Sequence, residues 1–191
     1  MATPARTSAT AAATRGRRSY RHGDLRRALL DAGVALAREG GPDAVVLREA
    51  TRRAGVVPNA AYRHFAVRQA LLDAVRIVAL DQLALAMEQQ MAVAAQVAEP
   101  ADRARALLRA VGVAYVGFAE SQPGLFRTAF SGTAAPAAPV TEPVDLPANG
   151  RDPLALLGSA LDAMVAANVL PAARRPGAEY LAWSTVHGFA V

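Results

Sequence analysis

The sequence contains no cysteine and no lysine, and aromatic residues make up only 5% of its 191 residues. The absence of cysteine excludes disulfides, a thiol nucleophile and every metal site that needs cysteine ligands. No run of about 18 or more apolar residues is present, and no apolar segment follows the N-terminal arginines, so neither a transmembrane helix nor a secretory signal is predicted. We therefore expect a cytoplasmic protein without membrane contact.

The residues that are present favour an all-α fold. Hydrophobic residues account for 53% of the chain and charged residues for 19%, which is enough apolar material for a core. Alanine makes up roughly a quarter of the chain, and alanine is the best helix former and a poor strand former. No strand-like alternation of apolar and polar residues is visible.

Positive charge is concentrated in the first part of the chain. Residues 1–76 hold 14 arginines and 6 acidic residues, whereas residues 77–191 hold 7 arginines and 10 acidic residues. This asymmetry indicates that the first part contacts a polyanion such as DNA. Residues 1–19 are small, polar and dotted with arginine, and are predicted to form a flexible basic arm.

Residues 20–67 have the pattern of a helix-turn-helix domain. Apolar residues spaced by three and four predict a helix from Asp24 to Arg38, ended by a Gly-Gly-Pro sequence. A short helix is expected over Leu47–Ala54, with Gly55 supplying a turn, and a third helix from Pro58 to about Phe65. Two short helices joined by a glycine-containing turn are typical of DNA-binding helix-turn-helix motifs.

Residues 68–191 are predicted to form further helices, interrupted by one loop. The expected helices cover 68–97, 101–121, 125–130, 154–169 and 177–191, and most are separated by proline or glycine. Residues 131–153 hold five prolines and two glycines, and they lack the periodicity that would let them pack. They are predicted to form a mobile surface loop.

Residues 22–75 resemble the DNA-binding domain of the TetR family of bacterial transcriptional regulators. The resemblance lies in the segments AREGGPDA, RRAGV, AAYRHF and ALLDAV, which occur at the expected separations. The back half resembles the subgroup with a Trp…His-Gly signature, here Trp183 and His187-Gly188. The resemblance implies a sequence-specific DNA-binding repressor, released from a palindromic operator by a small apolar or amphipathic ligand. It also implies a homodimer whose residues 68–191 bind the effector and dimerise, with no cofactor and no metal.

Two positions depart from the family pattern. The family usually has serine or threonine at the start of the second helix and serine just before the recognition helix, where this chain has Val46 and Val57. A hydroxyl at these positions accepts hydrogen bonds from free backbone N–H groups, and its loss costs about 1 kcal/mol. This departure keeps open an alternative function, a small-molecule-binding helical protein with weak or lost DNA binding.

The third helix is the expected recognition helix. Ala61 and Phe65 are four residues apart, share a face and should pack inward. Among the outward residues, Arg63 could donate two hydrogen bonds to guanine, Asn59 could pair with adenine and Ala60 could contact a thymine methyl group. The resemblance adds phosphate contacts by Tyr62 and His64, although His64 could instead cap a helix or pack. It also implies that Arg48 contacts a base or a phosphate and that Arg68 contacts a phosphate. The predicted DNA-binding residues are thus Arg48, Asn59, Ala60, Tyr62, Arg63, His64 and Arg68.

The resemblance also implies a ligand cavity between the DNA-binding helices and the last two helices. Its candidate lining residues are Met87, Met91, Tyr115, Phe118, Phe126, Phe130 and Trp183, although such side chains at helical spacing also occur in ordinary cores. The last two helices are predicted to form the dimer interface, through one stripe that includes Leu154, Leu157 and Leu161 and another that includes Tyr180, Leu181 and Phe189. In the family, ligand tilts the fourth helix and changes the separation of the two DNA-binding heads.

An enzyme is the main alternative class, and no enzymatic activity is predicted. The three histidines are far apart in sequence. Ser184, His187 and Asp162 could be drawn as a hydrolase triad, but the chain has no Gly-x-Ser-x-Gly nucleophile motif. We expect His187 to bond a buried polar partner and Gly188 to permit close helix contact. Sequence-neutral DNA packaging is a further alternative, which predicts uniform binding across sequences.

Overall fold

The computed structural model describes residues 22–132 and 152–191, and every regular element in these two ranges is helical. The helices are α1 (His22–Gly40), α2 (Leu47–Ala54), α3 (Pro58–Ala61), α4 (Arg68–Ala94), α5 (Pro100–Ser121), α6 (Pro123–Ala129), α7 (Pro153–Ala166) and α8 (Ala178–Ala190), with 3-10 turns η1 (Pro42–Ala44) and η2 (Ala172–Arg174). The prediction of an all-α fold is confirmed. The predicted arm and nearly all of the predicted loop lie outside the described residues.

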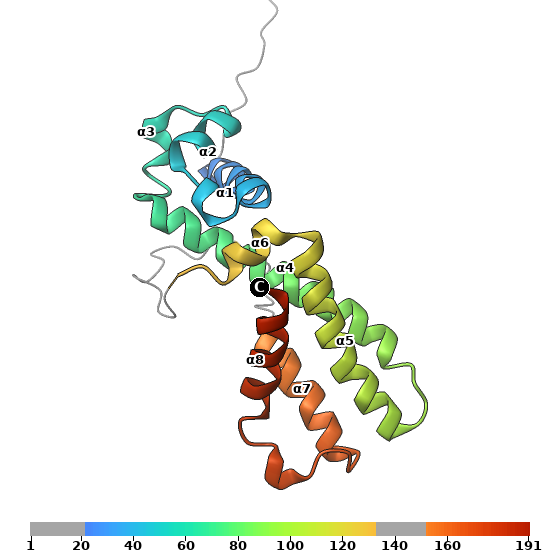
Figure 1. Ribbon diagram of the computed structural model, residues 1–191. Helices are drawn as coiled ribbons and strands as arrows, with labels where there is room; N and C mark the ends of the chain where they lie inside the picture. The colour runs from blue at the N-terminus through green and yellow to red at the C-terminus, as the bar shows by residue number, and fades with distance from the viewer. Residues whose placement is uncertain (1–21, 133–151) are drawn as a thin grey trace, which may run out of the picture.

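The helices are arranged along an elongated molecule (Figure 1). Helices α1, α2 and α3 form a head at one end, and α4 runs from the head along α5. Helices α7 and α8 pack against α5 beyond the head, and α6 lies between the two parts, in contact with both α1 and α4. A long helix therefore connects the head directly to the rest of the molecule.

The head is built around the apolar stripe of α1. Leu25, Leu29 and Leu36 of this stripe are at most 9% exposed. The helix begins two residues before the predicted start and ends at Gly40. The next residue, Gly41, has a φ of 75°, in the left-handed region that glycine adopts without strain. Helix α2 has the predicted bounds, and Gly55 closes it with a φ of 67°.

Helix α3 is shorter than predicted. It ends at Ala61, and the next three residues form a turn rather than a continued helix. The backbone N–H groups of His64 and Phe65 still donate to the Ala61 carbonyl, each at 2.9 Å. An isolated helix of one turn is unstable because nucleation is costly. The position of this segment therefore depends on the burial of Ala61 and Phe65 in the core of the head.

Among the described residues, no helix combines the length and the apolar character that crossing a bilayer requires. The longest, α4, has 27 residues, but it carries arginine, aspartate and glutamate along its length. Its apolar side chains, such as Leu71, Leu83 and Met87, are instead buried against the other helices.

Candidate nucleic-acid interface and ligand cavity

The segment from α3 to α4 presents a polar ridge to solvent. Asn59, Tyr62 and Arg63 are exposed, with Tyr62 57% exposed, whereas Ala61 and Phe65 are 0% and 2% exposed. The predicted inner position is confirmed for Ala61 and Phe65, and the predicted outer position for Asn59, Tyr62 and Arg63. Within the described residues, the side chains of Asn59, Tyr62 and Arg63 make no hydrogen bond or ion pair, so their polar groups remain available to a partner.

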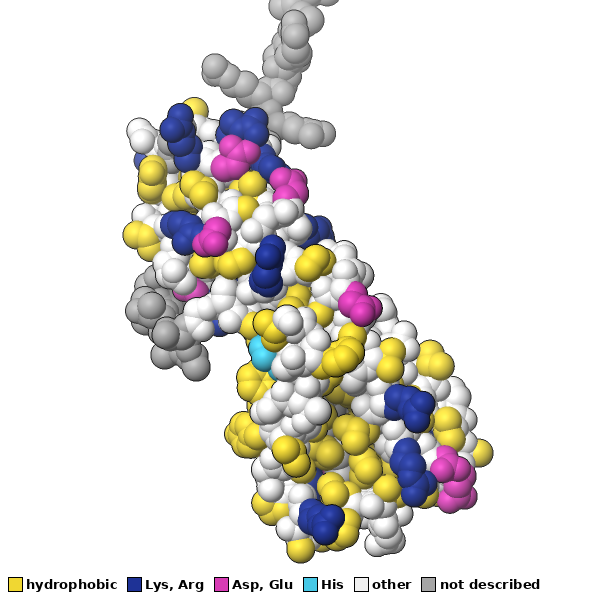
Figure 2. Space-filling view, in the orientation of Figure 1, with side chains coloured by type: hydrophobic (Ala, Val, Ile, Leu, Met, Phe, Trp, Pro, Cys, Tyr) yellow, Lys and Arg dark blue, Asp and Glu magenta, His cyan; other side chains and the backbone are white. Residues whose placement is uncertain are grey.

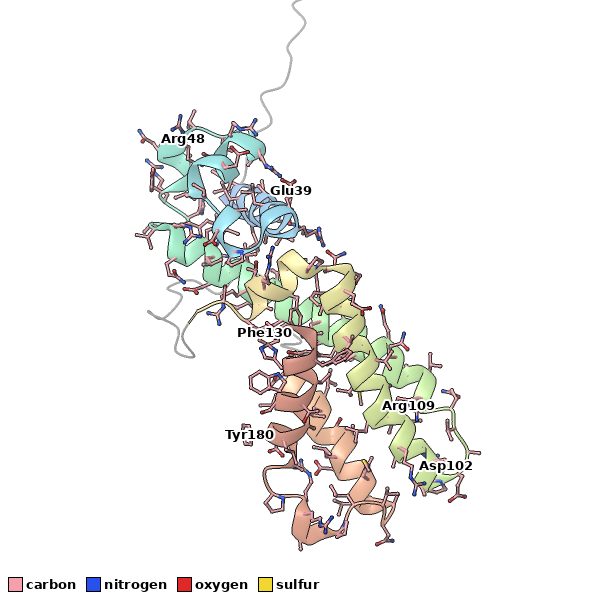
Figure 3. All side chains as sticks on the ribbon, in the orientation of Figure 1. Glu39, Arg48, Asp102, Arg109, Phe130 and Tyr180 are labelled. Atoms are coloured by element: carbon pink, nitrogen blue, oxygen red, sulfur yellow. The ribbon has the colours of Figure 1, made fainter. Side chains whose placement is uncertain are left out.

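The other predicted contact residues near α3 are less exposed. Ala60 and His64 are both half-buried, and Ala60 packs against the core of the head. Arg48, in the first turn of α2, is exposed and lies at the outer end of the head (Figure 3). Its guanidinium has no hydrogen bond or ion pair to the described part of the chain. Arg48 and Arg63 therefore offer two unengaged cationic groups on the head.

Two neighbouring arginines of α2, Arg52 and Arg53, are held by ion pairs. Arg53 donates from Nη1 and Nη2 to the two carboxylate oxygens of Glu39 at 2.6 Å each, which ties α2 to the end of α1. Arg52 donates to both oxygens of Glu49 at 2.6 and 2.9 Å. Hydrogen bonds from Arg52 and Arg53 lower the pKa of Glu49 to about 2. Arg53 thus links α2 to α1, whereas the pair of Arg52 and Glu49 lies within α2.

Arg68 also has a structural role. Its Nε donates to the carbonyl of Val45 at 2.8 Å, and its Nη2 donates to the carbonyl of Pro42 at 2.6 Å. These bonds attach the start of α4 to the connection between α1 and α2. Arginine has five N–H donors, so others remain for the predicted phosphate contact.

The starts of the two short helices are apolar. Val46 and Val57 are 43% and 69% exposed, and the N-cap residue of α2, Val46, provides no side-chain hydrogen bond. Figure 2 shows arginine, acidic and hydrophobic side chains intermingled on the visible face of the head. The candidate interface is therefore a mixed surface rather than a purely basic one.

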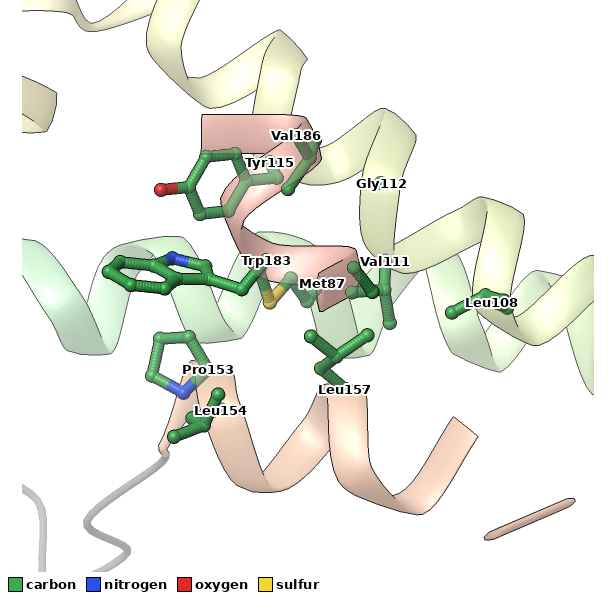
Figure 4. A pocket seen from close by; sticks show the side chains of 11 residues that line it. Met87, Leu108, Val111, Gly112, Tyr115, Pro153, Leu154, Leu157, Trp183 and Val186 are labelled. Atoms are coloured by element: carbon green, nitrogen blue, oxygen red, sulfur yellow. The ribbon is translucent and has the colours of Figure 1, made fainter. Parts of the chain in front are cut away.

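A cavity of about 190 Å³ lies between α4, α5, α7 and α8 (Figure 4). Its described lining is almost entirely apolar, and none of the lining residues in the described part of the chain is an arginine, aspartate, glutamate or histidine. The lining residues are Met87, Leu108, Val111, Gly112, Tyr115, Pro153, Leu154, Leu157, Ala182, Trp183 and Val186. Three of the seven candidate lining residues, Met87, Tyr115 and Trp183, are among them.

The other four candidates lie outside this lining. Phe118 is buried in the core and Met91 packs against it half-buried, whereas Phe126 and Phe130 belong to an aromatic cluster with Tyr115. Sequence reasoning missed the aliphatic lining residues because it selected methionine and aromatic types. A usable signal was the helical spacing of three and four residues that brings Leu108, Val111, Gly112 and Tyr115 onto one face of α5.

His187 lies at the centre of the aromatic cluster. Its Nδ1 shares a hydrogen bond of 2.6 Å with the hydroxyl of Tyr115, its ring stacks on Trp183 at 5.2 Å, and it meets the edge of Phe130 at 4.9 Å. Burial raises the pKa of Tyr115 to about 12, so the hydroxyl stays neutral. The expected buried polar partner of His187 is confirmed. Gly188 does not have the expected close contact with residues 22–132 or 152–191, since a Cβ there would meet none of their atoms within 4 Å.

Helix α6 connects this cluster to the head. Phe126 of α6 and Phe130, the C-cap residue of α6, contact the Tyr115 ring at centroid distances of 5.3 and 5.9 Å. At the other end of α6, a Cβ on Gly124 would lie 2.2 Å from the carbonyl oxygen of Ala37 in α1. Only glycine allows this approach, so α6 touches the wall of the cavity and the head at once.

The three residues of the conceivable hydrolase triad have separate partners. The Ser184 hydroxyl donates to the Tyr180 carbonyl at 2.6 Å. Asp162 accepts from Arg175 Nε at 2.6 Å, and His187 bonds Tyr115. No relay from Asp162 through His187 to Ser184 exists in this arrangement.

Two sequence families match the chain. Residues 29–75 match the family described as "Bacterial regulatory proteins, tetR family", and residues 108–191 match the family described as "Tetracyclin repressor-like, C-terminal domain". No curated protein matches the chain. The first match covers most of the head, and the second covers most of α5 and all of α6, α7 and α8. Assignment to the Trp…His-Gly subgroup stays a prediction. With an N-terminal and a C-terminal match joined on one helical chain, the protein belongs to the TetR family and is a DNA-binding transcriptional regulator, not an enzyme.

Proposed function

We propose that this regulator is a repressor that binds a palindromic operator as a homodimer and is released by a small apolar or amphipathic ligand. The observation that carries the proposal is the ridge of Asn59, Tyr62 and Arg63. It is exposed, its side chains make no hydrogen bond or ion pair with the rest of the described chain, and the burial of Ala61 and Phe65 holds it in place.

The chemistry of the ridge suits reading of the major groove. Arg63 can donate two hydrogen bonds to a guanine edge, and Asn59 can form a bidentate pair with adenine. Tyr62, Arg48 and Arg68 can fix the position of the head by contacting phosphates. One such head covers only a few base pairs, so two heads about 34–36 Å apart on a dimer would read a palindrome.

The proposed release depends on α4. Met87 near one end of this helix lines the cavity, and Arg68 at its other end is bonded to the head. A ligand that fits the cavity better when α4 is tilted would favour a state in which the two heads no longer fit the operator. The ligand must bind the two states with different affinities for this to occur.

Selection of bound sequences from a random DNA pool tests the proposal. We expect a palindromic consensus, which would also give the half-site spacing. Arg63→Ala should weaken binding to that consensus by about 1–3 kcal/mol and relax one base position. Arg109→Ala is the matched control, because it removes the same charge near the opposite end of the molecule (Figure 3). Equal binding to all sequences would instead indicate DNA packaging.

The uncapped start of α2 favours a second candidate function, a small-molecule-binding protein with weak DNA binding. Val46 has φ −115° and ψ 126°, the backbone conformation of an N-cap residue, but no side-chain acceptor. On this view Val46→Thr should raise both stability, by about 1 kcal/mol, and DNA affinity. Strong operator binding by the unmodified protein would exclude this candidate.

A further inference from the structure

We infer that the cavity between α4, α5, α7 and α8 selects an uncharged ligand the size of a single substituted ring, with about seven or eight non-hydrogen atoms. The inference rests on the proposed function, in which this cavity holds the effector, and it adds the chemical class of that effector. Three observations support it: the volume of the cavity, the absence of ionised groups from its described lining residues, and the ring surfaces on one side.

The volume sets the size. A dry cavity of about 150 Å³ lined by aliphatic and aromatic side chains is large enough to bind benzene. At about 190 Å³ this cavity has room for one or two more non-hydrogen atoms than benzene. Sites for drug-sized ligands usually measure about 300–1,000 Å³, so the space between these lining residues suits one substituted ring better than a compound of several fused rings.

The lining sets the charge. Among the eleven lining residues only Tyr115 is titratable, and burial raises its pKa to about 12, so it is neutral at ordinary pH. His187, the nearest titratable group to that hydroxyl, does not line the cavity, and its Nδ1 is already bonded to Tyr115. A carboxylate or ammonium group would lose its hydration without gaining an ionic partner, which is strongly unfavourable.

The aromatic side chains favour a planar ligand. Trp183 stacks on His187 at 5.2 Å, which fixes the indole ring at the cavity wall, and Figure 4 shows Tyr115 beside it. Ring ligands gain from stacked or edge-on contact with such surfaces. The Tyr115 hydroxyl is bonded to His187 and points away from the other labelled lining side chains in Figure 4, so the Tyr115 ring is the part of the side chain that meets a ligand.

Trp183 provides a direct readout, because it is the only tryptophan in the chain. Toluene and p-cresol should each change its fluorescence saturably and raise the melting temperature of the full-length protein. Benzoate and benzylammonium have similar shapes but carry a charge, and they should bind more than about 100-fold more weakly. A comparable response to either charged compound would overturn the inference.

Two variants test whether binding occurs in this cavity. Ala182→Leu adds side-chain atoms to the lining and should weaken toluene binding at least about tenfold, whereas Ala92→Leu adds the same atoms on an exposed part of α4 and should not. Leu108→Ala, at a half-buried position, should enlarge the cavity and create binding of naphthalene. Unchanged toluene binding by folded Ala182→Leu, or no gain of naphthalene binding by Leu108→Ala, would contradict the assignment.

A parallel DNA-binding measurement tests the ligand class separately from the proposed repressor function. If none of the four ring compounds binds but an operator is selected, the ligand class is wrong and the regulator stands. If toluene binds saturably but no DNA is selected, the ligand class stands and the repressor function is wrong.

Discussion

The arginines of the head differ in what their guanidinium groups contact. Arg53 and Arg68 donate to a carboxylate and to backbone carbonyls, whereas Arg48 and Arg63 have no partner among the described residues. The sequence could predict a basic head from composition alone. It could not separate the bracing arginines from the available ones, because the bonding partners Glu39, Pro42 and Val45 come close only through the packing of α1 against α2 and α4.

Arg68→Ala should affect both stability and DNA binding. Loss of the two hydrogen bonds to the carbonyls of Pro42 and Val45 should lower the free energy of unfolding by about 1 kcal/mol. Loss of a phosphate contact should weaken binding to all DNA sequences. It should also reduce the slope of log binding constant against log salt concentration by about 1. Urea unfolding and DNA titration at two salt concentrations measure the two effects. Arg48→Ala is the control for stability and should leave the unfolding curve unchanged.

Glu49 should make the stability of the head depend on acid pH. Its pKa is lowered from 4.5 to about 2 by hydrogen bonds from Arg52 and Arg53, so the folded state holds its proton less tightly than the unfolded state. The stabilisation from this carboxylate is present above about pH 4.5 and is lost as the pH falls through about 2. Melting temperatures of the unmodified protein and of Glu49→Gln should differ at pH 6 and converge near pH 2. A constant difference would argue against the ion pairs.

At the scale of elements, local signals predicted α2 well and α3 poorly. The bounds of α2 follow from its own sequence, since Gly55 ends it in the left-handed region. Helix α3 has no comparable end signal, and its length depends on where Phe65 reaches the core. Of the candidate cavity residues, Phe126 and Phe130 could not be assigned from sequence. The packing of α6 beside Tyr115 places them behind the cavity wall.

Substitution of Gly124 should loosen the junction between α6 and the head. A Cβ at this position would lie 2.2 Å from the Ala37 carbonyl oxygen and 2.6 Å from the Arg38 carbonyl oxygen, both main-chain atoms that cannot move independently. Gly124→Ala should therefore lower the melting temperature and reduce the effect of ligand on DNA affinity. Gly117→Ala is the matched control in α5, because its Cβ would meet nothing within 4 Å. It should raise stability by about 0.5–1 kcal/mol, as expected for glycine replaced inside a helix.

At the scale of the whole molecule, the predicted dimer stripes divide into two parts. Leu157 and Leu161 of α7 are 5% and 4% exposed, so they belong to the core of this chain. On α8, Tyr180, Leu181 and Phe189 are 61%, 73% and 77% exposed. Exposed apolar side chains clustered on one element are typical of an interaction surface. These residues of α8, together with Leu154 of α7, which is 37% exposed, remain available to a second copy of the chain.

Leu181→Glu should therefore separate the proposed dimer. A carboxylate at the centre of an apolar helix–helix contact would be buried without a partner in both subunits, so sedimentation should show monomers at micromolar concentrations where the unmodified protein is dimeric. Loss of the dimer should also lower operator affinity, because each head alone contacts only one half-site. Val93→Glu is the matched control, since Val93 is 71% exposed near the end of α4 that is remote from the head. A dimer that persists in Leu181→Glu would move the interface away from α8, and operator binding by a monomer would remove the need for a palindrome.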